Sequence, residues 1–341
     1  MRRSHINLLA ELAEAIKEVK EFLQESNASL DDILDYKNPS FALNKAIMSA
    51  KEAANQNDET RKRFDILCRE VFKKYQACLN VPEVNQYRQA HNAIKFIYKC
   101  LQEDLAKTDI TEILRELQLV VSQAIEVSRE DTEERELYDI SQIDFDRLKQ
   151  EFSKSQAKNT TVQTLKNAIE IRLRQMLARN PQRTNFQRHY EEMIANYNHE
   201  KDRLVIEQTF EALLIFVQNL DEESSRGVRE GLDEESLAIF DLLRKNKENL
   251  SPQTIKKIKN IATQLLEILK QEKLKIDNWR DKESTRDGVR GTIYDFLYSD
   301  ETGLPIDSYS EDEVSEKTEE VFRHIFRVYP TLPSPYYDTA A

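Results

Sequence analysis

Residues 161–198 read TVQTLKNAIEIRLRQMLARNPQRTNFQRHYEEMIANYN, a pattern of two amphipathic helices separated by a break. Apolar residues recur at helical spacing in both halves: Val162, Leu165, Ile169, Leu173, Met176 and Leu177, then Phe186, Tyr190, Ile194 and Tyr197. Because Pro181 lacks an N–H and disfavours the α region for Asn180, the first helix must end there. Thr184 and Gln187 match a Thr-x-x-Gln capping box, which predicts the start of the second helix. So short a break predicts an antiparallel helical hairpin.

The composition of the whole chain favours the same class of structure. The 341 residues include only five glycines, none before Gly227, and 33% are charged. Tight hairpins between strands need glycine or Asn-Gly pairs, whereas Glu, Lys, Leu, Ala, Gln and Arg are good helix formers. The sequence therefore predicts an all-α protein, a multi-helix antiparallel bundle with two packed helical subdomains.

A change in charge suggests where the subdomains divide. Residues 129–146 contain eight acidic and two basic residues. We predict an N-terminal bundle at 1–130, an acidic boundary segment at 131–146 and a C-terminal bundle at 147–330, followed by a loose tail at 331–341. A solvated acidic face of a helix explains the same charge run equally well.

Charge, hydropathy and cysteine spacing indicate the compartment. The formal net charge is −12 and the pI about 5.2, which argues against a surface that binds nucleic acid throughout. No apolar run reaches ~18 residues and the N-terminus leads into an amphipathic helix, so we expect no membrane span and no signal peptide. The three widely spaced cysteines are typical of reduced thiols. A cytoplasmic protein is expected.

A search for catalytic motifs finds none that fits its required context. No glycine-rich phosphate-binding loop is present, and no two histidines are spaced i, i+4. Glu18-Val19-Lys20 matches the Glu-x-Lys fragment of a nuclease site, but it falls in a predicted helix rather than on a strand. We therefore predict that this chain is not an enzyme and has no catalytic, cofactor-binding or metal-binding residues.

The predicted hairpin is basic within an acidic chain. Residues 154–203 contain ten lysines and arginines against five acidic residues. Four arginines are candidate contacts for DNA phosphates or for an acidic partner surface: Arg172, Arg179, Arg183 and Arg188. Ion pairs with neighbouring acidic helices of the same bundle are the alternative, which we favour because of the overall charge.

Several stretches resemble a known family when taken together and in order. They are 57–64 (NDETRKRF), 93–98 (AIKFIY), 177–186 (LARNPQRTNF), 194–198 (IANYN), 229–235 (REGLDEE), 239–243 (IFDLL), 321–325 (VFRHI) and 329–330 (YP). This ordered set resembles the C-terminal helical region of the restriction (R) subunit of type I restriction–modification enzymes. Each motif alone is weak, and the resemblance is strongest from about 140 to 330.

The resemblance implies a docking and coupling role. A complete R subunit has a nuclease domain, two ATP-driven motor domains and this helical region, and the parent complex is a type I site-specific deoxyribonuclease. The implied partners are the modification and specificity subunits, the motor domains of the R subunit, and DNA in the assembled complex. ATP and Mg²⁺ are expected only for the motor and nuclease domains, whose motifs this sequence lacks. The sequence thus looks like a fragment, either an expressed domain or the product of a truncated reading frame.

Two other functions remain open at this stage. The basic hairpin at 154–203 could guide duplex DNA into the motor. An unrelated helical scaffold that self-associates through an exposed apolar face is the third possibility.

Overall fold

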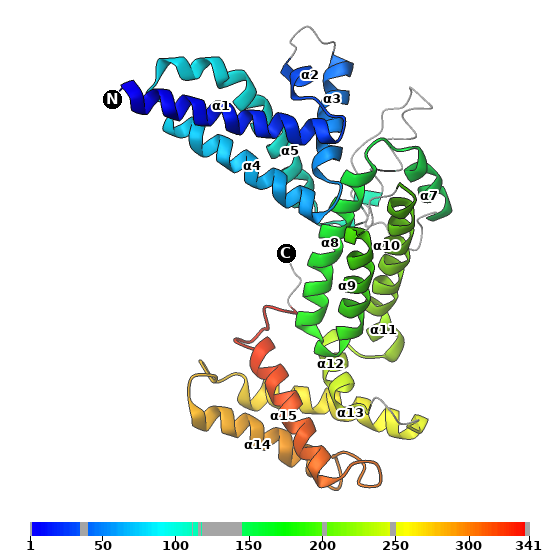
Figure 1. The fold of residues 1–341 in the computed structure, drawn as a ribbon. Helices are drawn as coiled ribbons and strands as arrows, with labels where there is room; N and C mark the ends of the chain where they lie inside the picture. The colour runs from blue at the N-terminus through cyan, green and yellow to red at the C-terminus, as the bar shows by residue number, and fades with distance from the viewer. Residues whose placement is uncertain are drawn as a thin grey trace, which may run out of the picture. The chain divides into compact units, whose positions relative to one another are not determined.

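A computed structural model describes residues 2–34, 40–110, 112–114, 117, 145–199, 203–245 and 250–337. Within these ranges the chain is helical and contains no strand, which confirms the predicted all-α class (Figure 1). The described residues form two compact units. Unit 1 comprises residues 1–171 and 190–218, and unit 2 comprises residues 172–189 and 219–341.

Unit 1 begins with helices that pack around an apolar core. These are α1 (Arg2–Glu25), α2 (Leu30–Leu34), α3 (Ser40–Ala54), α4 (Asp58–Ala77), the 3₁₀ helix η1 (Pro82–Tyr87) and α5 (Arg88–Ala106). Helices α1 and α4 lie side by side (Figure 1), and the rings of Phe22 and Phe64 meet between them at 5.4 Å. Leu12, Val19 and Ile94 are fully buried in this core. Burial of these side chains supplies the main stabilisation of the unit.

The remainder of unit 1 comes from a second group of helices. They are α7 (Phe145–Lys154) and parts of α8 (Lys158–Arg179), α9 (Thr184–His199) and α10 (Arg203–Ser224). Phe152 of α7 and Phe210 of α10 stack at 3.9 Å. Tyr190 of α9 donates its hydroxyl proton to Glu170 of α8 at 2.9 Å. The apolar stripe predicted for residues 162–177 of α8 is buried, apart from Leu177, which is only partly buried.

A partly buried carboxylate joins α3 to the N-terminus of α8 inside unit 1. Both carboxylate oxygens of Glu52 accept backbone N–H groups, from Asn159 and Thr160, at 2.8 Å each. The first N–H groups of a helix have no partner within it, so this carboxylate caps α8 from outside. Burial nevertheless raises the pKa of Glu52 above its ordinary value, against the effect of these hydrogen bonds.

Unit 2 contains the C-terminal helices and its own core. Its elements include α11 (Arg226–Glu230), α12 (Glu234–Leu243), α13 (Pro252–Ile268), the π-helical turn η4 (Leu269–Lys273), α14 (Glu283–Tyr298) and α15 (Glu311–Val328). Trp279, the single tryptophan, is 1% exposed and donates its indole N–H to the carbonyl of Tyr329 at 2.9 Å. Helix α15 begins with a capping box of Ser310 and Glu313.

The break in the hairpin is partly as predicted. Helix α8 ends at Arg179, and Asn180 is extended with φ −139° and ψ 105°, which confirms the effect of Pro181. The capping role predicted for Thr184 is wrong, because its φ of −63° and ψ of −21° are helical rather than extended. The cap is Asn180, which begins the 3₁₀ turn η3 (Pro181–Arg183) that continues directly into α9.

The structure bears differently on the predicted boundary at 131–146 and on the predicted tail at 331–341. Residues 118–144 lie outside the described residues, so the predicted boundary at 131–146 stays a prediction. Residues 147–171 and 190–218, which we assigned to the C-terminal bundle, belong to unit 1 together with the N-terminal helices. Residues 331–337, predicted as part of a loose tail, instead pack within unit 2. Ser334 is 1% exposed and donates to the carbonyl of Val328, and Tyr337 donates to the carbonyl of Arg179 at 2.6 Å. The sequence could not indicate these long-range contacts.

Candidate partner-binding site at the α8–α9 turn

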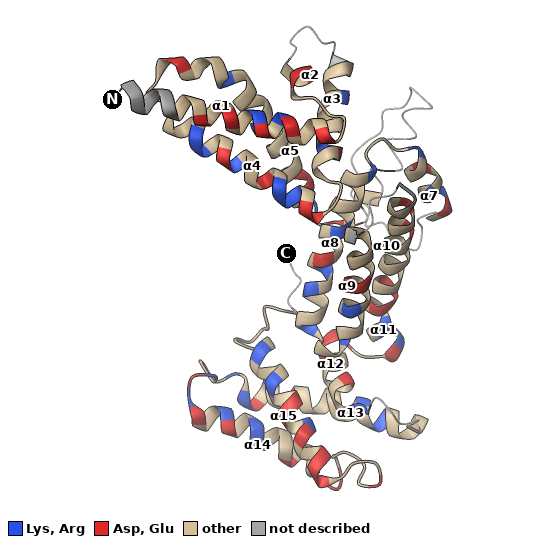
Figure 2. Cartoon of the chain, in the orientation of Figure 1, with Lys and Arg blue, Asp and Glu red and all other residues tan. Residues whose placement is uncertain are grey.

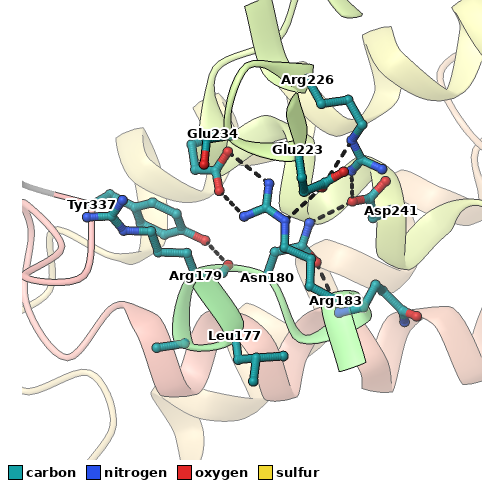
Figure 3. A network of polar contacts seen from close by, with 12 residues as sticks. Leu177, Arg179, Asn180, Arg183, Glu223, Arg226, Glu234, Asp241 and Tyr337 are labelled. Carbon is teal, nitrogen blue, oxygen red and sulfur yellow. Dashed lines mark hydrogen bonds and ion pairs between the residues drawn. The ribbon is translucent and has the colours of Figure 1, made fainter. Parts of the chain in front are cut away.

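The turn between α8 and α9 is held by a buried asparagine (Figure 3). Asn180 is fully buried, and its amide oxygen accepts the backbone N–H of Gln182 at 3.0 Å. Its amide nitrogen donates to Asp241 of α12 at 2.6 Å. One side chain therefore caps the 3₁₀ turn and joins it to α12.

Arg183 lies inside this turn and is saturated by carboxylates. It is 3% exposed, and its Nε donates to Glu223 of α10 at 2.8 Å while its two terminal nitrogens donate to Glu234 of α12 (Figure 3). Burial alone would lower the pKa of Arg183, but the hydrogen bonds and charges of Glu234 and Glu223 outweigh it and raise the pKa. The arginine is therefore a structural cation of unit 2 rather than a surface contact.

Arg226 of α11 completes the polar network. Its guanidinium pairs with Asp241 and lies 3.3 Å from Glu223 through Nε. The network thus holds two arginines and three carboxylates, and the carboxylates come from the end of α10 and from both ends of α12. Charged side chains can be buried when they are paired and hydrogen-bonded in this way. Removal of one of them destabilises the fold, because its partners are left as poorly solvated, unpaired charges.

The remaining candidate arginines differ in exposure. Arg172 is partly buried and donates to Asp221 at 3.3 Å and to Ser224 at 3.1 Å. Arg179 donates from Nε to the carbonyl of Tyr336 at 2.8 Å. Arg188 is exposed on α9 and pairs with no carboxylate among the residues that the structure describes. Only Arg179 and Arg183 come close to the turn itself, and internal pairing accounts for Arg172 and Arg183.

A pocket next to the turn was not predicted from the sequence. It has a volume of about 360 Å³ and lies between the turn, α12 and α15 of unit 2. Its lining residues are Pro181, Gln182, Leu242, Glu320, Arg323, His324 and Arg327. We call it the α15 pocket. The i, i+4 spacing of Arg323 and Arg327 was the available signal, but any charged helix shows such pairs.

His324 is a buried, neutral residue of α15 that lines the α15 pocket. It is 3% exposed, and burial, with a smaller effect of the Arg327 charge, lowers the pKa of His324 to about 3. Tyr337 donates its own proton to the carbonyl of Arg179, so His324 Nε2 must donate to the Tyr337 oxygen, 3.1 Å away. His324 Nδ1 is then a buried acceptor with no hydrogen-bond partner in the described residues.

The described residues show no other site that suggests chemistry. They contain no group of three or more His, Cys, Asp or Glu that could hold a metal ion. Cys68 and Cys78 are buried and Cys100 is partly buried, all as free thiols. No described helix is both long enough and apolar enough to cross a bilayer.

Comparison with known proteins identifies one family. A family model described as "Type I restriction enzyme HindI endonuclease subunit-like, C-terminal" matches residues 4–330. No curated protein and no solved structure matches the chain. The match excludes the alternative of an unrelated helical scaffold. The resemblance found in the sequence is thereby confirmed: this chain belongs to the family formed by the C-terminal region of type I restriction enzyme endonuclease-subunit-like proteins.

Proposed function

We propose that this chain is a non-catalytic docking and coupling module of a type I restriction subunit. It holds the ATP-dependent translocase and nuclease domains on the methyltransferase core of modification and specificity subunits. The observation that carries the proposal is the family match over residues 4–330, the C-terminal region of an endonuclease subunit. In this proposal ATP and Mg²⁺ act in the motor and nuclease domains, and DNA is contacted in the assembled complex.

The internal pairing of the candidate arginines supports docking over DNA guidance. Lys158, Lys166, Arg172 and Arg183 of the basic hairpin each pair with a carboxylate of the same chain. A duplex-binding surface needs cations that are free to replace the counterions of phosphates. Four of the hairpin's described cations are therefore already used, whereas Lys154, Arg174 and Arg188 are exposed and pair with no carboxylate among the described residues.

Co-elution tests the docking function directly. The chain is mixed with the modification–specificity complex of its own restriction system and analysed by gel filtration, with and without duplex DNA. We expect a stable complex without DNA. Absence of the complex under both conditions would contradict the proposal.

The DNA-guiding function has a separate test. Duplex binding by the chain alone is measured against salt concentration for the wild type and for Arg188→Glu. A steep salt dependence that Arg188→Glu reduces by about one phosphate contact, without docking on the modification–specificity complex, would favour DNA guidance.

A further inference from the structure

The two arginines of the α15 pocket have no carboxylate partner in the described residues. Arg323 donates from Nε to the carbonyl of Glu319 in its own helix at 3.2 Å. Arg327 donates from one terminal nitrogen to the carbonyl of Ala178 at 3.2 Å. Both guanidinium groups are exposed and retain several N–H donors that no described acceptor uses.

The acidic residues nearest in sequence are already paired elsewhere. Glu320, which lines the pocket, forms an ion pair with Lys317 at 2.8 Å, and Glu319 pairs with Arg290 at 2.6 Å. Arg323 and Arg327 follow the acidic residues of α15, which lie in the N-terminal part of the helix; acidic residues are coloured red and basic residues blue in Figure 2. The pocket therefore presents unneutralised positive charge in a chain whose net charge is −12.

The shape of the pocket suits a carboxylate carried on a side chain. Its volume of about 360 Å³ lies near the lower end of the range for binding pockets. Pro181 and Leu242 give it apolar walls, and the planar guanidinium fork binds carboxylates through two parallel hydrogen bonds. Because His324 is neutral, the positive charge of the pocket comes from the arginines alone.

The surroundings of the pocket favour a protein over a nucleic acid. Phe326 lies three residues after Arg323 on α15, which makes the two neighbours on the helix surface, and it is 37% exposed. Arginine beside an exposed aromatic side chain is typical of protein–protein interfaces, whereas the phosphates of a duplex are contacted by basic and polar side chains and by backbone N–H groups.

We propose that the α15 pocket binds an acidic side chain of a protein partner, with Arg323 and Arg327 forming the ion pairs and Phe326 packing beside them. This inference rests on the proposed docking function, and the partner is the modification–specificity complex. The pocket then defines which surface of unit 2 docks.

Charge reversal at Arg323 tests the pocket with little risk to the fold, because its recorded hydrogen bond is to its own helix. The dissociation constant for the modification–specificity complex is measured for the wild type, Arg323→Glu and Arg323→Lys. Lys256→Glu is the control, since Lys256 is exposed on α13 of the same unit and loses the same charge. Tryptophan fluorescence of Trp279 verifies that each variant is folded.

The expected results separate the pocket from the wider function. We expect about 30-fold weaker binding or more for Arg323→Glu, an intermediate loss for Arg323→Lys and wild-type binding for Lys256→Glu. Wild-type binding by Arg323→Glu would overturn the pocket proposal and leave docking intact. Failure of the wild type to bind would overturn the proposed function and this inference with it. Loss of duplex binding but not of docking in Arg323→Glu would assign the pocket to phosphate and overturn the inference.

Discussion

Replacement of Arg183 by alanine is the sharpest test of the polar network at the α8–α9 turn. The substitution removes a cation that is 3% exposed and leaves Glu223 and Glu234, whose side chains are 12% and 29% exposed, without it. Breaking a buried ion pair on one side costs roughly 3–5 kcal/mol. Here Glu234 loses its hydrogen bonds to Arg183, while Glu223 loses one and keeps Arg226 at 3.3 Å. We expect the free energy of unfolding to fall by about this amount.

Trp279 is a suitable reporter because it is the only tryptophan and is buried in the same unit. With a urea dependence of about 1–3 kcal/mol/M, the midpoint followed by its fluorescence is expected to fall by about 2 M. Arg183→Lys keeps the positive charge but not the planar guanidinium group that binds two carboxylates at once. We therefore expect an intermediate decrease in the urea midpoint.

The exposed Arg188 supplies the matched control. Arg188→Ala removes a cation of the same hairpin that has no carboxylate partner among the described residues, so the midpoint is expected to stay unchanged. Equal midpoints for Arg183→Ala and Arg188→Ala would refute the reasoning, since Arg183 would then contribute no more than a surface charge.

Three further predictions concern the core, a histidine and a thiol. Leu173→Ala should lower the free energy of unfolding by roughly 2–5 kcal/mol, because Leu173 is 4% exposed; an unchanged urea midpoint would show that its face is not core. The pKa of His324 is about 3 when folded and about 6.5 when unfolded, so the unfolded state binds the extra proton and stability falls as pH drops below about 6.5. At pH 5 the loss is about 2 kcal/mol, and thermal unfolding of His324→Gln at pH 7 and pH 5 should lack this component. Burial raises the pKa of the Cys68 thiol, so a thiol-specific reagent should modify Cys68 only on unfolding; rapid modification of the native protein would contradict this.

The helical fold could be predicted because its signals are local. Pro181 ends α8 through its own ring and missing N–H, and the stripe of Val162, Leu165 and Ile169 follows from the period of a helix. The Thr184 cap failed for an equally local reason, since Asn180 before Pro181 offered a competing cap one turn earlier and the 3₁₀ turn continued into α9. Sequence alone ranks such competing caps poorly.

The candidate site was only partly predictable. The sequence placed Arg183 in a basic hairpin, and ion pairing within the chain was one of two interpretations of its role. The sequence could not identify the partners, Glu223 and Glu234, because they lie 40 and 51 residues away. Arg323 lies within the family motif at 321–325 and Arg327 two residues after it. Nothing in the local sequence distinguishes these arginines from those of an ordinary charged helix face.

The sequence by itself determined that this chain is all-α, where α8 ends and which faces of its helices are apolar. These properties depend on backbone sterics and on a 3.6-residue period, both of which act within a few neighbouring positions. Only the tertiary structure decided that Arg183 is enclosed by Glu223 and Glu234 while Arg323 and Arg327 have no such partners. The physical reason is that an ion pair depends on the distance between atoms in space, and helix packing sets that distance between residues far apart in the chain.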